Sequence, residues 1–599
     1  QEDIATLEEV VIVGYGAQKR ENLTGAIETI KPEEIEELPV SNLAQALVGQ
    51  IPGLSVGGNG TRRPGEEADL QIRQSFGFSK DGNSTLPLIV IDDMVQVDPT
   101  TGKPTLDAFN RLDVSEIESI TVLKDGSAAI YGSRASQGAI IVKTKRGKIG
   151  ETKFSYSSQF SINDAVSHGK TMNAYESGIY NNRMQEAFGN DPVDNANRFY
   201  SAAELDEMKT LDYNWLDKAW KSAEQQKHSL TVSGGNEDAT YFGGITYFTQ
   251  GANLGEQNYK KWNFRTGVNT KIAKNLDASF SVSGNSGDIE KSFTKSSSSI
   301  RNGFASATTS SEQADYGLLL HMPKFVPITT TVDGEEYYMS PFHRTDRNLG
   351  GNQSTNSSIA GWNYFATLDS GSKQVSSDFS YNINASLNYK VPFLKGLSLK
   401  GSYSRSQTSS STNQVALPFT LARIKNFTSE DHHLASAAED GDYSIKDNTK
   451  QARVVYDNSG SKSEQANFFV SYKKTFGDHD IDAMVGVERS ESEYDFARLY
   501  YENPSKDYIG TYATAGTLTT NSYNNRGESG TLSYLGRLNY SYKSKYLLQL
   551  VFREDASTKF APENYWGFFP SMQVGWIMSK EDWFKNILPK IDFFKLRYS

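Results

Sequence analysis

Cysteine is absent from this sequence of 599 residues, and so is any long apolar run. The absence of thiols excludes disulfides and cysteine nucleophiles. It suits assembly in an oxidising compartment, although many cytosolic proteins also lack cysteine. No stretch of about 18 or more apolar residues occurs, so no segment is predicted to cross a membrane as a helix. A leader peptide is not recognisable at Gln1, as expected of a processed N-terminus.

Positive charge and catalytic motifs are also scarce. The 61 Lys and Arg residues are outnumbered by 72 Asp and Glu residues, and the net charge of −11 argues against a nucleic-acid partner. His432 and His433 lack the spacing of metal ligands, and no zinc-protease motif, nucleophile elbow or phosphate loop occurs. We therefore predict no catalytic residue, metal or cofactor, and no enzymatic activity. The acidic turn from Glu439 to Asp442 could hold Ca²⁺, but a solvated turn is favoured.

What the sequence does contain is aromatic residues, 32 Tyr and 31 Phe, set in alternating segments. Between Phe379 and Lys390 every second residue is apolar or aromatic, and the intervening residues are polar. Such a period of two places one set on each face of a β-strand. The pattern returns after short turns, which predicts hairpins. The paired segments are 379–390 with 397–404, 466–476 with 481–487, 532–542 with 546–553, and 230–234 with 241–247.

Alternation occurs in soluble β-sandwiches as well as in membrane barrels, so two further features matter. Short turns alternate with long polar stretches at about 288–376, 406–461 and 500–526, and tyrosines such as Tyr540, Tyr542 and Tyr546 cluster at strand ends. Both features favour a membrane barrel with short inner turns, long outer loops and an aromatic girdle. Residues 593–599 begin another strand, and because a barrel cannot end on an unpaired edge, we expect the chain to be part of a longer one.

The first 150 residues have a mixed α/β pattern. A short helix is predicted from Ser41, as its cap, to Val48, with strands at 88–91, 115–123 and 138–145. Ahead of them, the β-branched run from Glu8 to Val13 can pair with the sheet edge of a partner, or simply form the first strand of the domain. The glycines Gly14 and Gly16 resemble a dinucleotide-binding turn, but Lys19 stands where the third glycine is needed.

The most specific signal is the block from Glu116 to Ala135, which contains Val-Leu-Lys-Asp-Gly-Ser-Ala-Ala-Ile-Tyr-Gly-Ser-Arg-Ala, followed by Gly138 to Gly147. With Pro-Leu-Ile-Val-Ile-Asp ending at Asp92, it resembles the plug of TonB-dependent transporters of the SusC/RagA-like family. Blocks in the later strands also resemble that family, at 535–540, 552–553, 560–571 and 575–576. Asp93 and Gln74 depart from the family pattern, since glycine is usual at both positions.

The resemblance implies a transmembrane antiparallel β-barrel of about 22 strands, only partly present here, with an N-terminal α/β plug domain. It divides the chain into a TonB box and linker (1–16), a plug domain (17–148) and the N-terminal part of the barrel with long extracellular loops (149–599). It further implies TonB-dependent import of a nutrient oligomer, an oligosaccharide or alternatively an oligopeptide, across the bacterial outer membrane of a Gram-negative cell.

The implied partners are the lipid bilayer, a SusD-like surface lipoprotein that covers the barrel as a lid, and TonB of the inner-membrane TonB–ExbB–ExbD complex. A dimer of transporter–lipoprotein pairs is compatible with the family. The TonB box is expected at Glu8, Glu9, Val10, Val11, Ile12 and Val13. Structural ion pairs between plug and wall are expected from Lys124, Asp125, Arg134, Lys143 and Arg146, and a latch that opens under a pull is the alternative. A ligand-binding loop is expected at Phe76, Phe78, Lys80, Asp81 and Asn83.

Two other interpretations remain open from the sequence. A passive porin or adhesin barrel would need neither the N-terminal segment nor a plug. A soluble dinucleotide-binding enzyme joined to a β-domain would bind a nicotinamide cofactor and would not require detergent.

Overall fold

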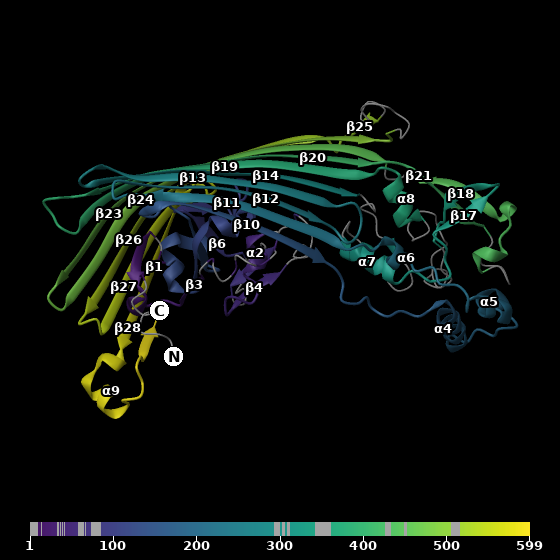
Figure 1. Cartoon of the computed structure of the whole chain (residues 1–599), viewed down its shortest axis with the longest axis horizontal. Helices are drawn as coiled ribbons and strands as arrows, with labels where there is room; N and C mark the ends of the chain where they lie inside the picture. The colour runs from purple at the N-terminus through teal and green to yellow at the C-terminus, as the bar shows by residue number, and fades with distance from the viewer. Residues whose placement is uncertain are drawn as a thin grey trace.

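The structure is a computed structural model with a curved sheet of long strands and a smaller α/β domain on its concave side (Figure 1). It describes residues 10–13, 15–30, 32, 35, 38, 40, 42–57, 65, 68–72, 86–292, 300–301, 306–307, 312–341, 361–425, 433–448, 452–504 and 516–598. All structural statements below concern these residues.

The large sheet, here called the wall, has 14 strands, and every neighbouring pair is antiparallel. Short turns join most strands at one end, where the connection from β28 to β29 also carries α9 (Asp582–Ile587), and the other long connections lie at the opposite end. In order across the sheet, the strands are β10 (Gly150–Asn163), β11 (Ala223–Gly235), β12 (Ala239–Gly251), β13 (Asn258–Ala273), β14 (Leu276–Ser292), β19 (Lys373–Lys390), β20 (Leu397–Ala416), β23 (Arg453–Phe476), β24 (His479–Glu502), β26 (Tyr523–Tyr542), β27 (Tyr546–Ser557), β28 (Trp566–Ile577) and β29 (Lys595–Tyr598), with β25 (Thr517–Leu518) paired to β24.

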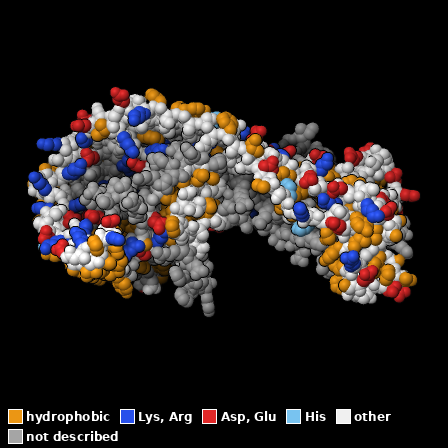
Figure 2. All heavy atoms as spheres, turned by 60° about the horizontal axis from the view of Figure 1, so that its bottom comes forward, with side chains coloured by type: hydrophobic (Ala, Val, Ile, Leu, Met, Phe, Trp, Pro, Cys, Tyr) orange, Lys and Arg blue, Asp and Glu red, His pale blue; other side chains and the backbone are white. Residues whose placement is uncertain are grey.

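The wall has polar side chains on its concave face and apolar ones on its outer face, which is the reverse of a sheet in a soluble protein. On β13, Lys261, Asn263 and Arg265 face inward and are buried, whereas the neighbouring Trp262 faces outward and is 48% exposed. Figure 2 shows hydrophobic side chains on the outer surface of the curved sheet and charged ones gathered at its short-turn end. An apolar exterior is stable only against an apolar solvent, as in a bilayer. Other outward-facing apolar residues are Phe154, Ile162, Leu230, Ile245, Phe280, Leu387, Phe468, Val485, Leu550 and Phe552.

The domain on the concave side, here called the plug, contains a five-stranded sheet of order β3-β8-β9-β6-β7, in which only β6 and β9 are parallel. Its core is formed by two groups of buried apolar residues, one on each side of this sheet. The elements are β3 (Ile27–Ile30), α2 (Leu43–Ala46), β4 (Leu54–Gly57), β5 (Asp69–Ile72), β6 (Leu88–Ile91), β7 (Met94–Gln96), α3 (Asp107–Arg111), η3 (Val114–Glu116), β8 (Ile117–Leu123), η4 (Gly126–Ala135) and β9 (Ala139–Thr144).

The predicted plug elements are present, with small shifts. The helix begins after Asn42 rather than Ser41, because the Asn42 side chain accepts a hydrogen bond from the backbone N–H of Gln45 at 2.9 Å. Strand β6 turns into β7 through Asp92 and Asp93, whose φ angles of 48° and 73° are both left-handed. A two-residue hairpin turn of this kind favours glycine, so the turn forms here despite an unfavourable residue type.

The N-terminal segment forms a hairpin of its own. Strand β1 (Val10–Val13) pairs antiparallel with β2 (Gly16–Lys19), with Val13 opposite Gly16. The chain then passes through the short helix η1 (Arg20–Asn22) into the plug sheet. In this structure the β-branched run is therefore a strand paired within its own chain.

Three long connections at the far end of the wall fold together into one body, here called the outer unit (Figure 1). They join β10 to β11, β14 to β19, and β20 to β23. Residues from all three form one buried cluster that includes Trp215, Phe325 and Leu434. Its elements are α4 (Ala174–Ala187), α5 (Ala202–Glu207), α6 (Trp215–Ala219), α7 (Glu312–Leu320), β17 (Thr329–Val332), β18 (Glu335–Tyr338), α8 (Tyr364–Asp369), β21 (Phe419–Ile424) and β22 (Tyr443–Asn448).

The outer unit corrects the predicted extent of the loops. The stretch 406–461 was expected to be a polar loop, but β20 continues to Ala416 and β23 begins at Arg453. Serine, threonine and asparagine occupy both faces there, so pairing continues after the apolar alternation has ended. The connection between β10 and β11 carries helices that the strand pattern did not reveal. Within the described residues, no helix combines the length and the apolar character needed to cross a bilayer.

Replacing Trp215 by alanine should unfold the outer unit while leaving the wall intact. Trp215 is 1% exposed, and its indole N–H donates to the Val326 carbonyl at 2.8 Å. We expect a loss of about 3–5 kcal/mol in the unit's stability. Faster amide hydrogen exchange in α6 and α7 would measure it. Phe188→Ala, at a side chain that is 69% exposed, is the control. Equal exchange in the two variants would contradict a shared core.

Candidate functional site

The interface between plug and wall holds the largest concentration of buried charge among the described residues. The inward-facing side chains of the wall meet charged side chains of the plug, and several of the buried charges form ion pairs across the interface. Three clusters carry most of these contacts. They are centred on Glu488 of the wall, on the Asp92–Asp93 turn of the plug, and on Asp113 and Glu116 of the plug.

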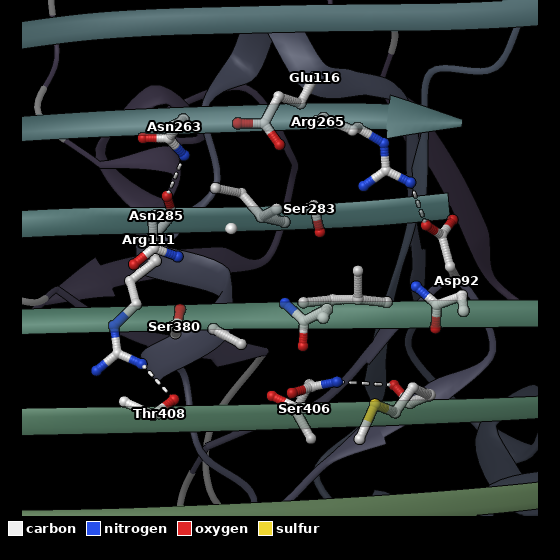
Figure 3. Close-up of a pocket in the computed structure, with 18 residues that line it drawn as sticks. Asp92, Arg111, Glu116, Asn263, Arg265, Ser283, Asn285, Ser380, Ser406 and Thr408 are labelled. Carbon is white, nitrogen blue, oxygen red and sulfur yellow. Dashed lines mark hydrogen bonds and ion pairs between the residues drawn. The ribbon is translucent and has the colours of Figure 1, made fainter. Parts of the chain in front are cut away.

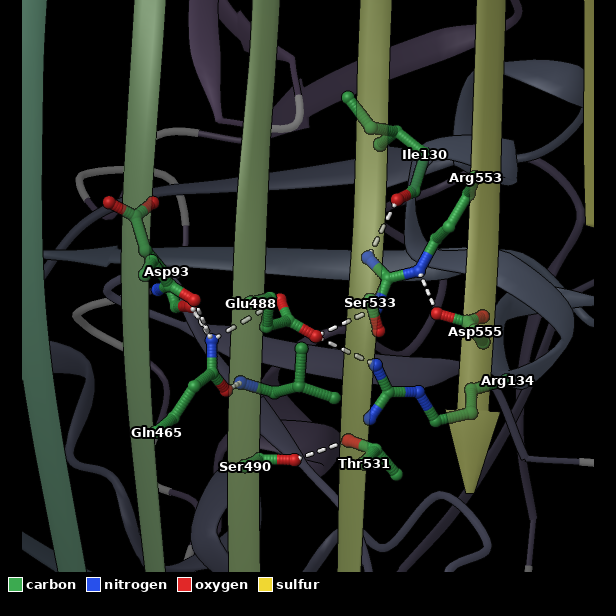
Figure 4. Close-up of polar contacts among 12 residues, drawn as sticks. Asp93, Ile130, Arg134, Gln465, Glu488, Ser490, Thr531, Ser533, Arg553 and Asp555 are labelled. Carbon is green, nitrogen blue, oxygen red and sulfur yellow. Dashed lines mark hydrogen bonds and ion pairs between the residues drawn. The ribbon is translucent and has the colours of Figure 1, made fainter. Parts of the chain in front are cut away.

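The first cluster surrounds the carboxylate of Glu488 on β24, which is fully buried (Figure 4). Its Oε1 atom accepts from Arg553 of β27 at 2.7 Å and from Arg134 of η4 at 2.9 Å. Its Oε2 atom accepts from the hydroxyl of Tyr15 and, at 3.4 Å, from Gln465. One wall carboxylate therefore holds the plug helix, the N-terminal segment and its own neighbouring strands.

Arg553 fastens η4 to the wall a second time (Figure 4). It pairs with Asp555 at 2.6 Å and donates to the carbonyl of Ile130 at 3.0 Å. The helix comes close enough because Gly132, at φ 73°, has no side chain where Asp555 and Arg553 lie. Any larger residue would meet the Asp555 carboxylate.

The second cluster lies at the β6–β7 turn. Asp92 pairs with Arg265 of β13 at 2.8 Å, and both side chains are almost fully buried. Asp93 accepts from Lys143 of β9 at 2.5 Å and from Lys400 of β20 at 2.7 Å. Burial alone would raise the pKa of each aspartate, but these cations hold both pKa values below the ordinary range. Both carboxylates therefore stay charged, and the turn is bound to two wall strands.

In the third cluster, Asp113 pairs with Lys227 of β11 at 2.9 Å, whereas the nearby Glu116 forms no ion pair with any residue that the structure describes. Burial, followed by the charge of Asp113, raises the pKa of Glu116 to about 7. Glu116 borders a small cavity of about 30 Å³, which also contacts Arg111 and Arg265 (Figure 3). The cavity is lined mainly by amides and hydroxyls of the wall, so it suits water rather than a nutrient.

A larger cavity of about 480 Å³ lies above the Glu488 cluster, towards the longer connections. Arg134 forms part of its floor, the plug turn at Thr101 and Gly102 forms one side, and Asp555 and Phe569 line the wall side. Its volume is within the range of small-ligand pockets, and its lining combines hydroxyls with aromatic rings. A third cavity of about 400 Å³ lies near the short turns and is lined by Tyr15, Asp93 and Arg146.

The predicted plug charges fall into different roles. Arg134 reaches the wall, as described. Lys124 stays within the plug, where it pairs with Glu28 at 2.7 Å, and Lys143 also pairs within the plug. Asp125 does not form an ion pair among the described residues. It caps η4 by accepting from the Ser127 N–H at 3.0 Å, because a free helix N-terminus lies directly after it. Arg146 reaches the wall through a hydrogen bond to Ser279 at 3.5 Å.

Several predicted residues lie outside the described part of the chain. These are Glu8 and Glu9 of the expected TonB box, and the whole expected ligand loop of Phe76, Phe78, Lys80, Asp81 and Asn83. Of the TonB box, the structure describes only the backbone of Val10, Val11, Ile12 and Val13, as strand β1.

The described residues contain no cluster of His, Asp and Glu suited to a metal ion. His433 is buried in the outer unit, where its Nδ1 atom lies 2.8 Å from the Glu204 carboxylate. The acidic turn at Glu439 and Asp442 forms a mutual cap on a short helix.

Sequence reasoning missed the partners on the wall, chiefly Glu488, Arg553, Arg265 and Lys400. A signal for them was present. Ile481, Ala483, Val485 and Val487 form the outward face of β24, so Glu488 on the other face is a charge directed into the interior. In a soluble protein the same alternation would place the apolar residues inside and Glu488 in solvent. The inward position of Glu488 can therefore be predicted only if the strand belongs to a membrane barrel.

Comparison with known proteins agrees with this architecture. A family model described as the TonB-dependent receptor plug domain matches residues 19–139. The TonB-dependent receptor SusC of Bacteroides thetaiotaomicron is 28% identical over 98% of this chain and 52% of its own length. The TonB-dependent receptor P3 of Formosa agariphila is 24% identical over 98% of this chain and 50% of its own. The chain thus spans about half the length of these curated relatives.

Among solved structures, one described as the RagAB peptide importer in the open-open state superposes with a TM-score of 0.71. It is 21% identical and covers 98% of this chain, which covers 60% of it. The fold and the plug match agree with the architecture of TonB-dependent receptors, a β-barrel with an N-terminal plug. Over almost its whole length the chain is similar to SusC, in agreement with the SusC/RagA-like resemblance of its motifs.

Removing Arg265 should loosen the plug. Arg265→Ala leaves the buried Asp92 carboxylate without its partner, which costs about 3–5 kcal/mol. Thermal unfolding of the purified protein would measure the loss. Adding Asp92→Asn should restore part of it, because the uncompensated charge is then gone. Lys148→Ala is the control, since its pair with Glu118 is exposed and spans 4.0 Å. An equal effect of both single changes would contradict a structural role for the buried pair.

Glu116 should make the stability of the plug depend on pH. Because its pKa is raised to about 7 in the folded protein, the folded plug binds a proton that the unfolded chain releases at lower pH. The stabilisation is complete below the ordinary glutamate pKa and is lost as the pH rises towards 7. We expect the melting temperature of the plug to fall between pH 5 and pH 8, and to fall less in Glu116→Gln. Identical pH profiles would contradict the shift.

Proposed function

We propose that this chain takes part in energised import of a nutrient oligomer across the outer membrane of a Gram-negative bacterium. TonB of the inner-membrane TonB–ExbB–ExbD complex acts on residues 8–13, and a SusD-like surface lipoprotein covers the outer end. The favoured substrate is an oligosaccharide. The likeness to a structure described as a peptide importer supports an oligopeptide as the second candidate.

The observation that carries this proposal is the way the plug is held within the wall. Buried pairs join plug to wall at Asp92–Arg265, Asp113–Lys227 and Arg134–Glu488, and a partly exposed pair joins them at Asp93–Lys400. Breaking one buried pair without replacing it costs about 3–5 kcal/mol, and every 1.4 kcal/mol reduces an open population tenfold. Spontaneous displacement of the plug is therefore rare, and passage of a large solute requires external work.

The path for that work is the N-terminal hairpin. Strand β2 continues through η1 directly into the plug sheet, so tension on residues 8–13 reaches the plug through the backbone. An extended β-branched segment is suited to adding a strand to the sheet of a partner. In this proposal β1 leaves its pairing with β2, or offers its other edge, when TonB binds.

Deleting residues 8–13 should abolish uptake while leaving membrane insertion and ligand binding unchanged. A matched variant keeps the length but replaces residues 10–13 by glycine and serine, and it should fail in the same way because it lacks strand-forming side chains. Uptake of labelled oligosaccharides and oligopeptides by whole cells measures the effect, and heat-modifiable migration of the barrel controls for insertion. Retained energised uptake would defeat the assignment. An open conductance of the unaltered protein in liposomes would favour a passive pore instead.

A further inference from the structure

Tyr15 occupies an unusual position between the two strands of the N-terminal hairpin. Its ring lies 4.6 Å from that of Phe469 on wall strand β23 and 5.3 Å from that of Tyr131 on η4 (centroid distances). Its hydroxyl donates to Glu488 on β24. Tyr15, two residues after the end of the expected TonB box at Val13, thus reaches the point where the plug meets two strands of the wall.

Glu488 uses its two oxygens for different parts of the molecule. Arg134 and Arg553 both bond to Oε1, whereas Tyr15 bonds to Oε2. Loss of the Tyr15 bond therefore leaves both arginine contacts in place. The plug helix also keeps its separate bond from Arg553 to the Ile130 carbonyl.

The other hairpin residues whose side-chain surroundings the structure describes, Gly16 and Gln18, offer weaker means of attachment. Gly16 lies against the guanidinium of Arg537, where a side chain would collide. Gln18 is buried, but its Nε2 atom lacks a hydrogen-bond partner among the described residues. The next ion pair along the described part of the chain comes after the hairpin, where Glu21 pairs at 3.0 Å with Lys580 in the connection between β28 and β29.

We propose that Tyr15 is a positioning residue whose hydroxyl fastens the N-terminal hairpin to Glu488, so that breaking this one bond frees residues 10–19 from the wall while the plug stays in place. The hairpin is then a first stage of release, with Glu21 as the next point of attachment. The proposal rests on the proposed function only for the identity of the protein that pulls.

Tyr15→Phe tests this with little disturbance, because the ring and its packing remain. Amide hydrogen exchange of the whole chain in detergent, without TonB or substrate, would be followed in the peptide covering residues 10–19. A hydrogen bond to a buried charge is strong enough that we expect exchange there to be about tenfold faster or more. Exchange in β6, β8 and β9 should be unchanged.

Tyr131→Phe is the matched control. The hydroxyl of Tyr131 is buried in the same aromatic group but has no hydrogen-bond partner among the described residues, so its removal should leave the hairpin's exchange unchanged. Equal exchange in the two variants would overturn the proposal, and so would exchange of the plug sheet together with the hairpin. Since the chain has no cysteine, a nitroxide on Val11→Cys gives a second readout, with a larger mobile fraction expected in Tyr15→Phe.

A binding measurement separates this proposal from the proposed function. Freed hairpins should bind an isolated TonB C-terminal domain more tightly in Tyr15→Phe than in Tyr131→Phe. Faster exchange with no binding of TonB by any variant would support the role of Tyr15 and count against TonB as the pulling protein. Unchanged exchange with tight TonB binding would contradict the role of Tyr15 and support TonB as the pulling protein.

Discussion

Charged groups buried on the concave face of the wall are costly unless they are paired, and much of the structure follows from that constraint. Because the outer surface is apolar, the polar residues of each strand face inward, where water is largely replaced by the plug. Charges such as Glu488, Arg265 and Lys400 therefore need partners, and the plug supplies them. The same contacts that satisfy the charges of the wall fix the plug in one orientation.

The constraint also explains a departure from the family pattern. Asp93 occupies a left-handed turn position that favours glycine, yet its carboxylate lies between Lys143 and Lys400. The backbone strain of a non-glycine residue there is of the order of 1 kcal/mol, and two buried charge-assisted bonds offset it. The residue that looked out of place in the sequence is thus one of the contacts between plug and wall.

The alternation of apolar and polar residues was sufficient to predict the strands and hairpins, because each strand shows this alternation in its own sequence. The strand predicted at 379–390 lies within β19, and the strand predicted at 88–91 is β6. The pairing of Arg134 with Glu488 could not be read in this way, since 354 positions separate the two residues. Asp125 illustrates the opposite error. It was assigned to an ion pair from its charge, although its place before a helix start made a cap the simpler role. The helices of the outer unit were missed because their apolar residues are few and are spread over three distant connections.

The shared core of the outer unit has a consequence for how such proteins can diversify. Because Trp215, Phe325 and Leu434 come from different connections yet pack in one cluster, each connection is a fragment of a fold rather than an independent appendage. Grafting a single one from a relative would leave unmatched apolar surface on both sides of the junction. Exchange of these connections between relatives should therefore proceed by transfer of all three segments as a set, or by changes confined to residues on the surface of that body.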